Sequence, residues 1–379
     1  MKLYLNSDQA PPLALFLPSL SGGGAERVML NLARGISQHD LQVDLVLAKA
    51  EGPYLKQLPT GIKVIDLAAR RTLASIPRLA RYLRQRRPQA LLTALNHANM
   101  AALAAKKLSG TPTRVVVSEH NELFPGKLID KEGVLFQRLM RYTYAWADGI
   151  VAVSEGVADS LARVCDMPRC RIMVIYNPVI GEELHQRARE PLQHPWFAPG
   201  EPPVILGIGR LHQQKDFGNL IRAFALLRRE QPARLIILGE GEERPALERL
   251  ALELSLTEDL SLPGFVDNPY AYLAHSAAFV LSSAWEGLPT VLIEALAVGT
   301  PVVSTDCPSG PREILQNGKF GPLVPIRDSA ALAKAITDIL VSPVPKVPAA
   351  WLKQFTLEAA TRHYLDALGV KLPEPLTAS

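Results

Sequence analysis

The segment that decides the fold is Phe279-Val-Leu-Ser-Ser-Ala-Trp-Glu-Gly-Leu-Pro-Thr-Val-Leu-Ile-Glu294. Its first residues form an apolar run typical of a buried β-strand, and Pro289 suits the first turn of a helix, where a missing N–H costs nothing. Glu286 is therefore expected in the loop after the strand, and Glu294 one to two turns into the helix. At a rise of ~1.5 Å per residue, the two carboxylates would lie on the order of 10 Å apart along a ligand-binding sheet edge. An ordinary strand-loop-helix with two unrelated glutamates is the alternative.

A second strand-turn-helix pattern lies near the start of the chain. The apolar run Leu13-Ala-Leu-Phe-Leu17 is typical of a buried parallel strand, and Ser21-Gly-Gly-Gly-Ala-Glu-Arg27 follows it. A helix is then indicated by Val28, Leu32 and Ile36 at four-residue spacing. Backbone N–H groups and the helix dipole in such a turn favour a phosphate or another anion, although a glycine run also serves as a simple tight turn.

Strand-like runs alternate with helical patterns through most of the 379 residues. This alternation predicts the α/β class, with two tandem Rossmann-like domains, each built on a doubly wound, mostly parallel sheet. Five prolines and a glycine in residues 191–203 predict the linker between the domains. The predicted division is a first domain of residues 1–190, that linker, a second domain of residues 204–345, and a tail of residues 346–379 whose helix returns to the first domain.

Composition excludes several other classes. Hydrophobic residues make up 48% of the chain and charged residues 21%, as in a folded globular protein rather than a disordered one. The first residues lack the apolar core of a signal peptide, and no run of eighteen uncharged apolar residues occurs, so a cytoplasmic location is expected. An odd number of cysteines (Cys165, Cys170 and Cys307) argues against a disulfide framework, and their spacing fits no zinc site.

Charge is concentrated in the first half of the chain. Residues 1–190 contain 25 Lys and Arg against 17 Asp and Glu, and seven arginines lie between Arg70 and Arg87. A solvated helix face explains such a run, and contact with anionic lipid, as in a peripheral protein on the inner face of a membrane, is the alternative. Tyr82 is the one aromatic residue in the run, so a stacking platform for nucleic acid is not indicated.

The second domain opens with Gly207-Ile-Gly-Arg-Leu-His-Gln-Gln-Lys-Asp216. Arg210 and Lys215 flank a strand-to-helix turn, so both cationic groups can converge on one anion at the start of the helix. A diphosphate carries enough charge to use both of them.

Taken together, these motifs resemble the retaining nucleotide-sugar glycosyltransferases of family 4, also called group 1, essentially from end to end. The resemblance implies the GT-B arrangement, with the acceptor mainly on the first domain and the nucleotide-sugar donor mainly on the second. The segments that carry it are Gly22-Gly-Gly-Ala-Glu-Arg27, Ser118-Glu-His-Asn121, Gly209-Arg-Leu211 with Lys215, Gly239-Glu-Gly241, Gly264-Phe-Val266, Glu286 to Glu294, and Cys307-Pro-Ser-Gly-Pro-Arg-Glu313.

The resemblance also implies a role for each matching residue. Arg210 and Lys215 would neutralise the donor diphosphate as the sugar departs, and Glu286 would face the transferred sugar. The remaining donor contacts would be backbone groups at Gly23, Gly24, Leu288 and Thr290 for the phosphates, the carboxylate of Glu294 for the ribose, and backbone groups of Val266 for the base.

His120 matches the family position that faces the reacting end of the sugar, although a histidine at the end of a buried strand also serves a structural purpose. It need not be a general base, because family members are thought to retain configuration through front-face attack, with the leaving phosphate taking the acceptor's proton. Candidates for acceptor contact are Glu26, Glu119, Asn96 and Asn99.

The expected activity is therefore transfer of a hexose, with a UDP-sugar favoured as donor, to a saccharide or lipid-linked saccharide in polysaccharide biosynthesis. No Asp-x-Asp motif or metal-ligand cluster occurs, so no metal and no other cofactor are expected. A nucleotide-sugar epimerase of the same two-domain fold and a non-catalytic subunit that binds nucleotide sugar remain alternatives. The sugar, acceptor, linkage and oligomeric state are left open.

Overall fold

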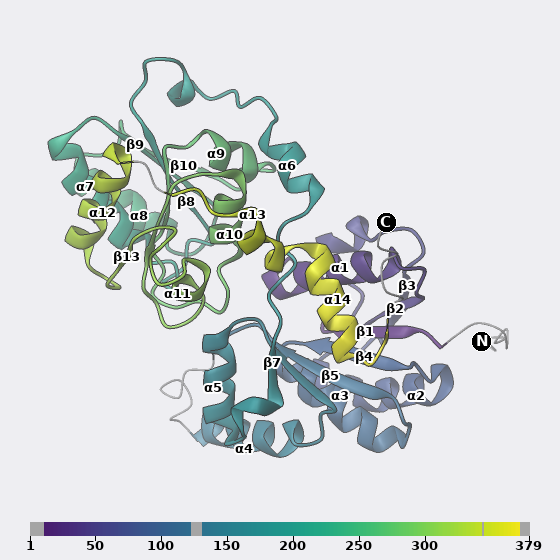
Figure 1. The fold of residues 1–379 in the computed structure, drawn as a ribbon. Helices are drawn as coiled ribbons and strands as arrows, with labels where there is room; N and C mark the ends of the chain where they lie inside the picture. Colours follow the sequence, from purple (N-terminus) through teal and green to yellow (C-terminus); the bar gives the residue numbers. More distant parts are fainter. Residues whose placement is uncertain (1–10, 123–130, 343–344, 372–379) are drawn as a thin grey trace. The chain divides into compact units, whose positions relative to one another are not determined.

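A computed structural model describes residues 11–122, 131–342 and 345–371, and the chain divides into two compact units (Figure 1). The first unit contains the described residues up to Pro178 together with those from Leu357 onward, and the second runs from Val179 to Thr356. Each unit is built around its own parallel sheet. The expected α/β class with two Rossmann-like domains is confirmed.

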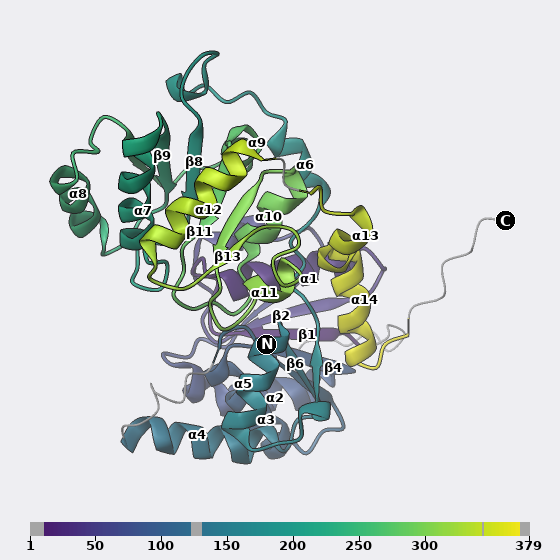
Figure 2. The same cartoon turned by 60° about the vertical axis from the view of Figure 1, so that its left-hand side comes forward.

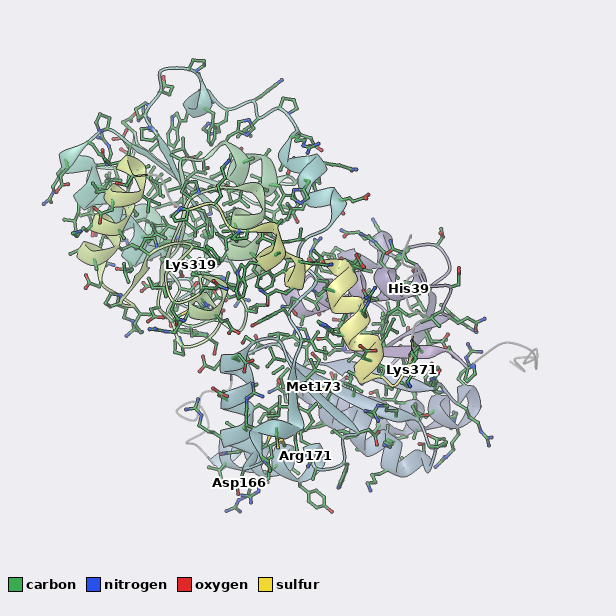
Figure 3. The ribbon with its side chains drawn as sticks, viewed as in Figure 1. His39, Asp166, Arg171, Met173, Lys319 and Lys371 are labelled. Carbon is green, nitrogen blue, oxygen red and sulfur yellow. The ribbon has the colours of Figure 1, made fainter. Side chains whose placement is uncertain are left out.

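The sheet of the first unit has seven strands in the order β3-β2-β1-β4-β5-β6-β7. The order reverses direction between β1 and β4, which is the point of an open α/β sheet where ligands commonly bind at the carboxyl edge. Met173 on the edge strand β7 is exposed (Figure 3). The strands are β1 (Leu13–Leu17), β2 (Val43–Leu47), β3 (Lys63–Asp66), β4 (Ala90–Ala94), β5 (Arg114–Glu119), β6 (Gly149–Ala152) and β7 (Ile172–Val174).

Helices of the first unit bury apolar faces against this sheet. Leu32 and Ile36 of α1 are fully buried with Leu15 and Leu45 of the central strands. The helices are α1 (Gly24–Ser37), α2 (Ile76–Arg86), α3 (Asn96–Ser109), α4 (Lys131–Tyr144), α5 (Glu155–Cys165) and α14 (Leu357–Ala367).

The second unit repeats the plan with the order β10-β9-β8-β11-β12-β13, which reverses between β8 and β11. Helices α7 and α12 pack side by side, as two views of the ribbon show (Figures 1 and 2). The strands are β8 (Val204–Ile208), β9 (Arg234–Leu238), β10 (Leu260–Gly264), β11 (Ala278–Leu281), β12 (Val302–Thr305) and β13 (Leu323–Val324). The helices are α6 (Glu182–Ala188), α7 (Phe217–Glu230), α8 (Arg244–Glu253), α9 (Pro269–His275), α10 (Thr290–Val298), α11 (Pro311–Ile314), α12 (Ser329–Val341) and α13 (Ala349–Leu352).

The boundary between the units lies earlier than the predicted linker. The second unit begins at Val179, and the proline-rich residues 191–203 belong to it. The reason is that α6 packs on α9: Arg187 of α6 forms an ion pair with Asp267, and Asn268 donates a hydrogen bond to the Arg187 carbonyl. Helices α6 and α9, of seven residues each, show no clear helical pattern in the sequence.

The last helix, α14, returns to the first unit as expected and packs on α1. A Cβ atom at Gly35 of α1 would lie 2.1 Å from the Thr361 hydroxyl oxygen of α14. The absence of a side chain at Gly35 is therefore what lets the two helices approach.

Three of the seven arginines of the basic run contact other parts of the first unit. Arg86 pairs with the buried Asp44 of β2, while Arg78 donates to the carbonyls of Leu67 and Ala68. Arg84 donates to the carbonyls of Leu108 and Ser109. All seven arginines except Arg86, which is partly exposed, have exposed side chains.

One carboxyl group lies inside the first unit. Glu119, the last residue of β5, is fully buried and accepts hydrogen bonds from the Tyr144 hydroxyl and from Asn99 Nδ2, the latter at 2.9 Å. Its other oxygen, Oε2, has no partner among the described residues. Burial raises the pKa of Glu119 from its ordinary 4.5 to about 7, because the charged form loses its hydration.

We expect Gly35→Ala to lower the free energy of unfolding by ~1–3 kcal/mol, because the new methyl group overlaps Thr361. Urea unfolding measures the change. Gly24→Ala at the start of the same helix is the control, because a Cβ atom there meets nothing within 4 Å. Adding Thr361→Ala should restore part of the loss, since the buried Thr361 hydroxyl has no partner among the described residues. Equal stability of the two glycine variants would contradict this account.

Glu119→Gln should change the pH dependence of stability. Between pH 4.5 and about 7 the folded protein keeps a proton on Glu119 that the unfolded chain has released, so this residue's contribution to stability falls as pH rises through that window. Glutamine removes the effect, and the variant should gain up to ~3 kcal/mol relative to the wild type between pH 5 and pH 8. Unfolding curves at both pH values check this, and a pH-independent difference would refute it.

Candidate active site

The main candidate residues of the second unit lie on the loops that follow β8 and β11. These strands are neighbours at the point where the strand order reverses, so their following loops meet at the carboxyl edge of the sheet. Arg210 and Lys215 lie on the first loop, and Glu286 lies on the second. The fold thus brings together residues that are about seventy positions apart in the sequence.

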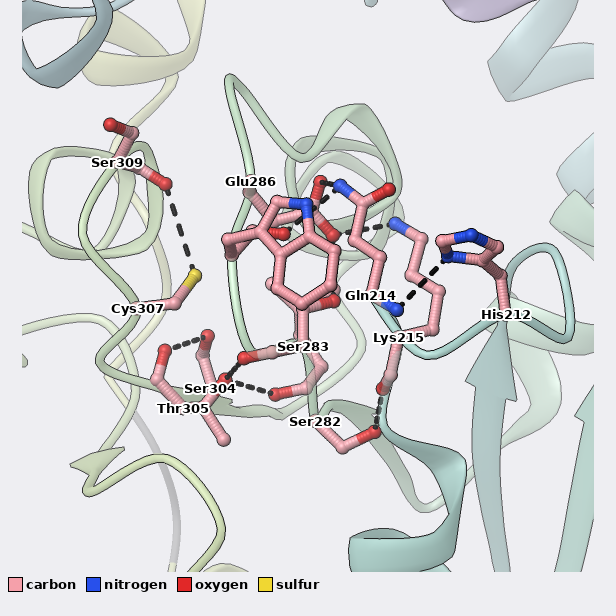
Figure 4. A network of polar contacts seen from close by, with 12 residues as sticks. His212, Gln214, Lys215, Ser282, Ser283, Glu286, Ser304, Thr305, Cys307 and Ser309 are labelled. Carbon is pink, nitrogen blue, oxygen red and sulfur yellow. Dashed lines mark hydrogen bonds and ion pairs between the residues drawn. The ribbon is translucent and has the colours of Figure 1, made fainter. Parts of the chain in front are cut away.

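Lys215 and Glu286 form an ion pair, with 2.6 Å between Lys215 Nζ and Glu286 Oε1 (Figure 4). The Glu286 side chain is 7% exposed, and the Ser283 hydroxyl also donates to Oε1 at 2.6 Å. The Gln214 amide lies 3.5 Å from the other carboxylate oxygen. A buried carboxylate held by a cation and a hydroxyl keeps one orientation.

Hydrogen bonds to backbone groups fix the two loops to each other. Ser282 Oγ donates to the Lys215 carbonyl at 2.7 Å, and the Ala284 N–H donates to the Gln214 carbonyl at 2.8 Å. Thr305 at the end of β12 donates to the Ser283 carbonyl at 2.6 Å (Figure 4). The ion pair therefore lies on a rigid support.

Gly310 supports the Glu286 loop from a third segment. It has φ of +92°, and a Cβ atom there would lie 2.4 Å from Pro289 Cδ and 3.2 Å from the Gly287 carbonyl oxygen. A residue with a side chain would push this loop away. This contact gives the Cys307-to-Glu313 segment a structural purpose that its sequence did not reveal.

Arg210 differs from Lys215 in its surroundings. Its side chain is exposed and makes no ion pair or hydrogen bond within the described part of the chain. The loop beneath it is tightly held, since Gly209 and Leu211 donate their N–H groups to the carbonyls of Leu238 and Glu240. A Cβ atom at Gly239 would lie 2.0 Å from the Gly209 carbonyl oxygen, so glycine is needed there.

The other donor-side candidates lie along the same unit. Leu288 is buried, and Thr290 opens α10 with its side chain partly exposed. Glu294 lies just over one turn into α10 and is partly exposed, as the sequence pattern predicted. Val266 follows β10 and is partly exposed, and its neighbour Phe265 is 83% exposed.

In the first unit, the glycine turn after β1 already holds an anion of its own. The carboxylate of Glu26 accepts hydrogen bonds from the Gly22 N–H at 2.7 Å and from the Gly23 N–H at 3.1 Å. Gly24 is exposed at the start of α1. A phosphate that used the Gly23 N–H would therefore have to displace Glu26.

His120 follows β5 and is 9% exposed. Its Nε2 lies 3.1 Å from the Ser118 hydroxyl, and that hydroxyl lies 3.0 Å from the hydroxyl of Tyr364 on α14. Burial lowers the pKa of His120 to about 4, so the ring is neutral at physiological pH. No sequence pattern points to Tyr364, which is 246 positions from Ser118.

The remaining acceptor candidates differ in exposure. Glu119 and Asn99 are fully buried and bond to each other and to Tyr144, an arrangement that favours a structural role over contact with an acceptor. Asn96, at the start of α3, is partly exposed. It follows Leu95, whose backbone has φ of +76°, an uncommon value for a residue with a side chain.

Among the described residues, no group of three or more His, Cys, Asp and Glu side chains is placed to hold a metal ion. None of the described helices is both long and apolar enough to span a bilayer.

Two family models match successive parts of the chain. The model of Glycosyltransferase Family 4 matches residues 22–182, and that of Glycosyl transferases group 1 matches residues 189–354. The chain is 37% identical over 190 residues to the uncharacterized glycosyltransferase MJ1059 of Methanocaldococcus jannaschii, covering 49% of this chain and 47% of that protein.

A full-length likeness comes from Campylobacter jejuni. Its N-acetylgalactosamine-N,N'-diacetylbacillosaminyl-diphospho-undecaprenol 4-alpha-N-acetylgalactosaminyltransferase is 31% identical over 341 residues, covering 86% of this chain and 90% of that enzyme. Among solved structures, Anabaena Alr3699/HepE in complex with UDP matches with a TM-score of 0.79 at 19% identity, covering 94% of this chain and 99% of that one, which supports the fold. The chain belongs to the family 4, or group 1, glycosyltransferases, and is a retaining, metal-independent enzyme of the GT-B fold.

Proposed function

We propose that this enzyme transfers a hexose or an N-acetylhexosamine from a UDP-sugar to a hydroxyl of a lipid-linked saccharide during glycan assembly on the cytoplasmic side of a membrane. The observation that carries the proposal is the buried Glu286 carboxylate paired with Lys215 where the β8 and β11 loops meet. An ordered carboxylate beside a cation suits a sugar with several hydroxyls attached to a diphosphate.

Lys215 and the unpaired Arg210 would neutralise the diphosphate as the bond to the sugar breaks. Stabilising charge that develops in the transition state accelerates the reaction itself, and one such contact is commonly worth ~3 kcal/mol. With two cations available, a divalent metal is not needed for this task. The backbone at Gly23, Gly24, Leu288 and Thr290 would add further phosphate contacts, while Glu294 and Val266 would hold the ribose and the base.

Glu286 would accept hydrogen bonds from hydroxyls of the transferred sugar and stabilise positive charge at its anomeric carbon. Attack would come from the face that the diphosphate leaves, and the leaving phosphate would take the acceptor's proton. His120 would contact the same sugar, with Asn96 and Glu26 as the remaining candidates for acceptor contact.

The choice of donor and acceptor is supported by the relatives. The Campylobacter enzyme at 31% identity is named as an N-acetylgalactosaminyltransferase acting on a diphospho-undecaprenol-linked saccharide. Rhizobium meliloti LpsE, named as a lipopolysaccharide core biosynthesis glycosyltransferase, is 36% identical over 179 residues, which cover 52% of that protein. A lipid-linked acceptor would also bring the enzyme to a membrane surface, where the exposed Arg81 and Arg87 of the basic run would contact anionic lipid.

A donor and acceptor panel tests the proposal. The enzyme is incubated with UDP-glucose, UDP-GalNAc, UDP-GlcNAc or GDP-mannose, each with and without a pool of polyprenyl-diphosphate-linked saccharides. We expect release of UDP only with acceptor present, and no loss of rate in EDTA. Isomerised sugar without nucleotide release would instead indicate an epimerase, binding without turnover a silent subunit, and restoration by Mg²⁺ after loss in EDTA a metal-dependent enzyme.

Lys215→Ala should lower kcat on the order of a hundredfold, in line with ~3 kcal/mol for one contact to developing charge. Lys334→Ala, which removes an exposed lysine paired with Asp338 in the same unit, is the matched control and should leave kcat unchanged. Glu286→Ala should cost as much as Lys215→Ala, and the double variant little more, because the two groups act as one unit. Full activity of Glu286→Ala would contradict the role proposed for Glu286 toward the transferred sugar.

A further inference from the structure

Three buried side chains form a hydrogen-bonded row that ends at His120. Tyr364 and Ser118 have no exposed surface, and His120 is 9% exposed. The Tyr364 and Ser118 hydroxyl oxygens are 3.0 Å apart, and Ser118 Oγ is 3.1 Å from His120 Nε2. The row therefore joins helix α14 to the loop after β5 within the first unit.

The position of the proton in each contact follows from the burial of Tyr364. Ser118 is the hydrogen-bond partner recorded for the Tyr364 hydroxyl within the described part of the chain. If Ser118 donated to Tyr364, the phenol proton would be buried without an acceptor, which costs ~1–3 kcal/mol. Tyr364 therefore donates to Ser118, and Ser118 uses its own proton toward His120 Nε2. That nitrogen must then be the acceptor, without a proton of its own.

We propose that Tyr364 and Ser118 are positioning residues that hold His120 in the neutral tautomer with its proton on Nδ1. The inner nitrogen is occupied by Ser118, so Nδ1–H is the group that His120 offers to a ligand. A group that already carries its proton donates a hydrogen bond and does not remove a proton. The Nδ1–H group of His120 would thus donate a hydrogen bond to an oxygen of the ligand, such as a hydroxyl of the transferred sugar. His120 would not be the base that removes the proton of the attacking hydroxyl.

The burial of His120 supports the same assignment, since it lowers the pKa to about 4 and keeps the ring neutral at physiological pH. The role toward sugar rests on the proposed function, whereas the tautomer does not.

Nitrogen-15 NMR of histidine-labelled protein measures the tautomer directly, because long-range couplings distinguish protonated Nδ1 from protonated Nε2. The variant His120→Gln identifies the His120 signals among those of the eight histidines. We expect the wild type to show the proton on Nδ1. In Tyr364→Phe, the Ser118 oxygen loses its donor and can accept from Nε2–H, and in Ser118→Ala the contact with Nε2 is lost. The Nε2–H form should therefore gain population in both variants. A proton on Nε2 in the wild type, or an unchanged pattern in both variants, would overturn the proposal.

Tyr82→Phe is the matched control. Tyr82 is a buried tyrosine of the same unit whose hydroxyl donates to Asp44 at 2.8 Å, so the variant loses a buried phenol hydroxyl without touching the row. It should leave the His120 pattern unchanged, and a change there would mean that general loosening moves the tautomer.

The second test measures the rate of sugar transfer. Tyr364→Phe should lower kcat about five- to tenfold with little change in the donor KM, and Tyr82→Phe should not. A shifted tautomer with unchanged kcat would overturn the sugar-facing role of Nδ1–H. If no donor is turned over by the wild type, the proposed function fails, while the NMR arm still decides the tautomer.

Discussion

The ion pair between Lys215 and Glu286, 2.6 Å long, is the interaction on which the candidate donor site depends. Holding a carboxylate that is 7% exposed requires a cation and hydrogen bonds, because an unpaired buried charge is very costly. The Ser283 hydroxyl and the backbone bonds between the two loops meet this requirement. Breaking the pair would leave one buried charge alone, so both residues are constrained together.

The first unit meets the burial of polar groups in another way. Burial keeps His120 neutral and raises the pKa of Glu119 to about 7. The backbone N–H groups of its glycine turn are suited to a phosphate, but they donate to the carboxylate of Glu26. In the proposed function, recognition of the diphosphate by charge would rest with Lys215 and Arg210 of the second unit, while His120 of the first unit would offer a neutral hydrogen-bonding group to the sugar.

Much of the fold was predictable because parallel strands buried on both faces form continuous apolar runs, as in Leu13–Leu17 and the run that begins at Phe279. Strand β13 has two residues, too few to produce such a run. Residues 191–203 lie within the second unit, and proline content marks irregular backbone whether it links two units or lies inside one. Short helices such as α6 were missed because seven residues make barely two turns.

The sequence by itself determined the fold class, the loops that carry Arg210, Lys215, Glu286 and His120, and the family, because strand periodicity and local motifs are written in neighbouring residues. Tertiary structure alone decided which groups are paired. It paired Lys215 with Glu286, bonded the Glu26 carboxylate to the glycine turn, and buried Glu119 and Asn99. It also placed Tyr364 within hydrogen-bonding distance of Ser118, which is 246 positions away in the sequence. The physical reason is that burial and hydrogen bonding depend on distances between elements, which no local pattern encodes.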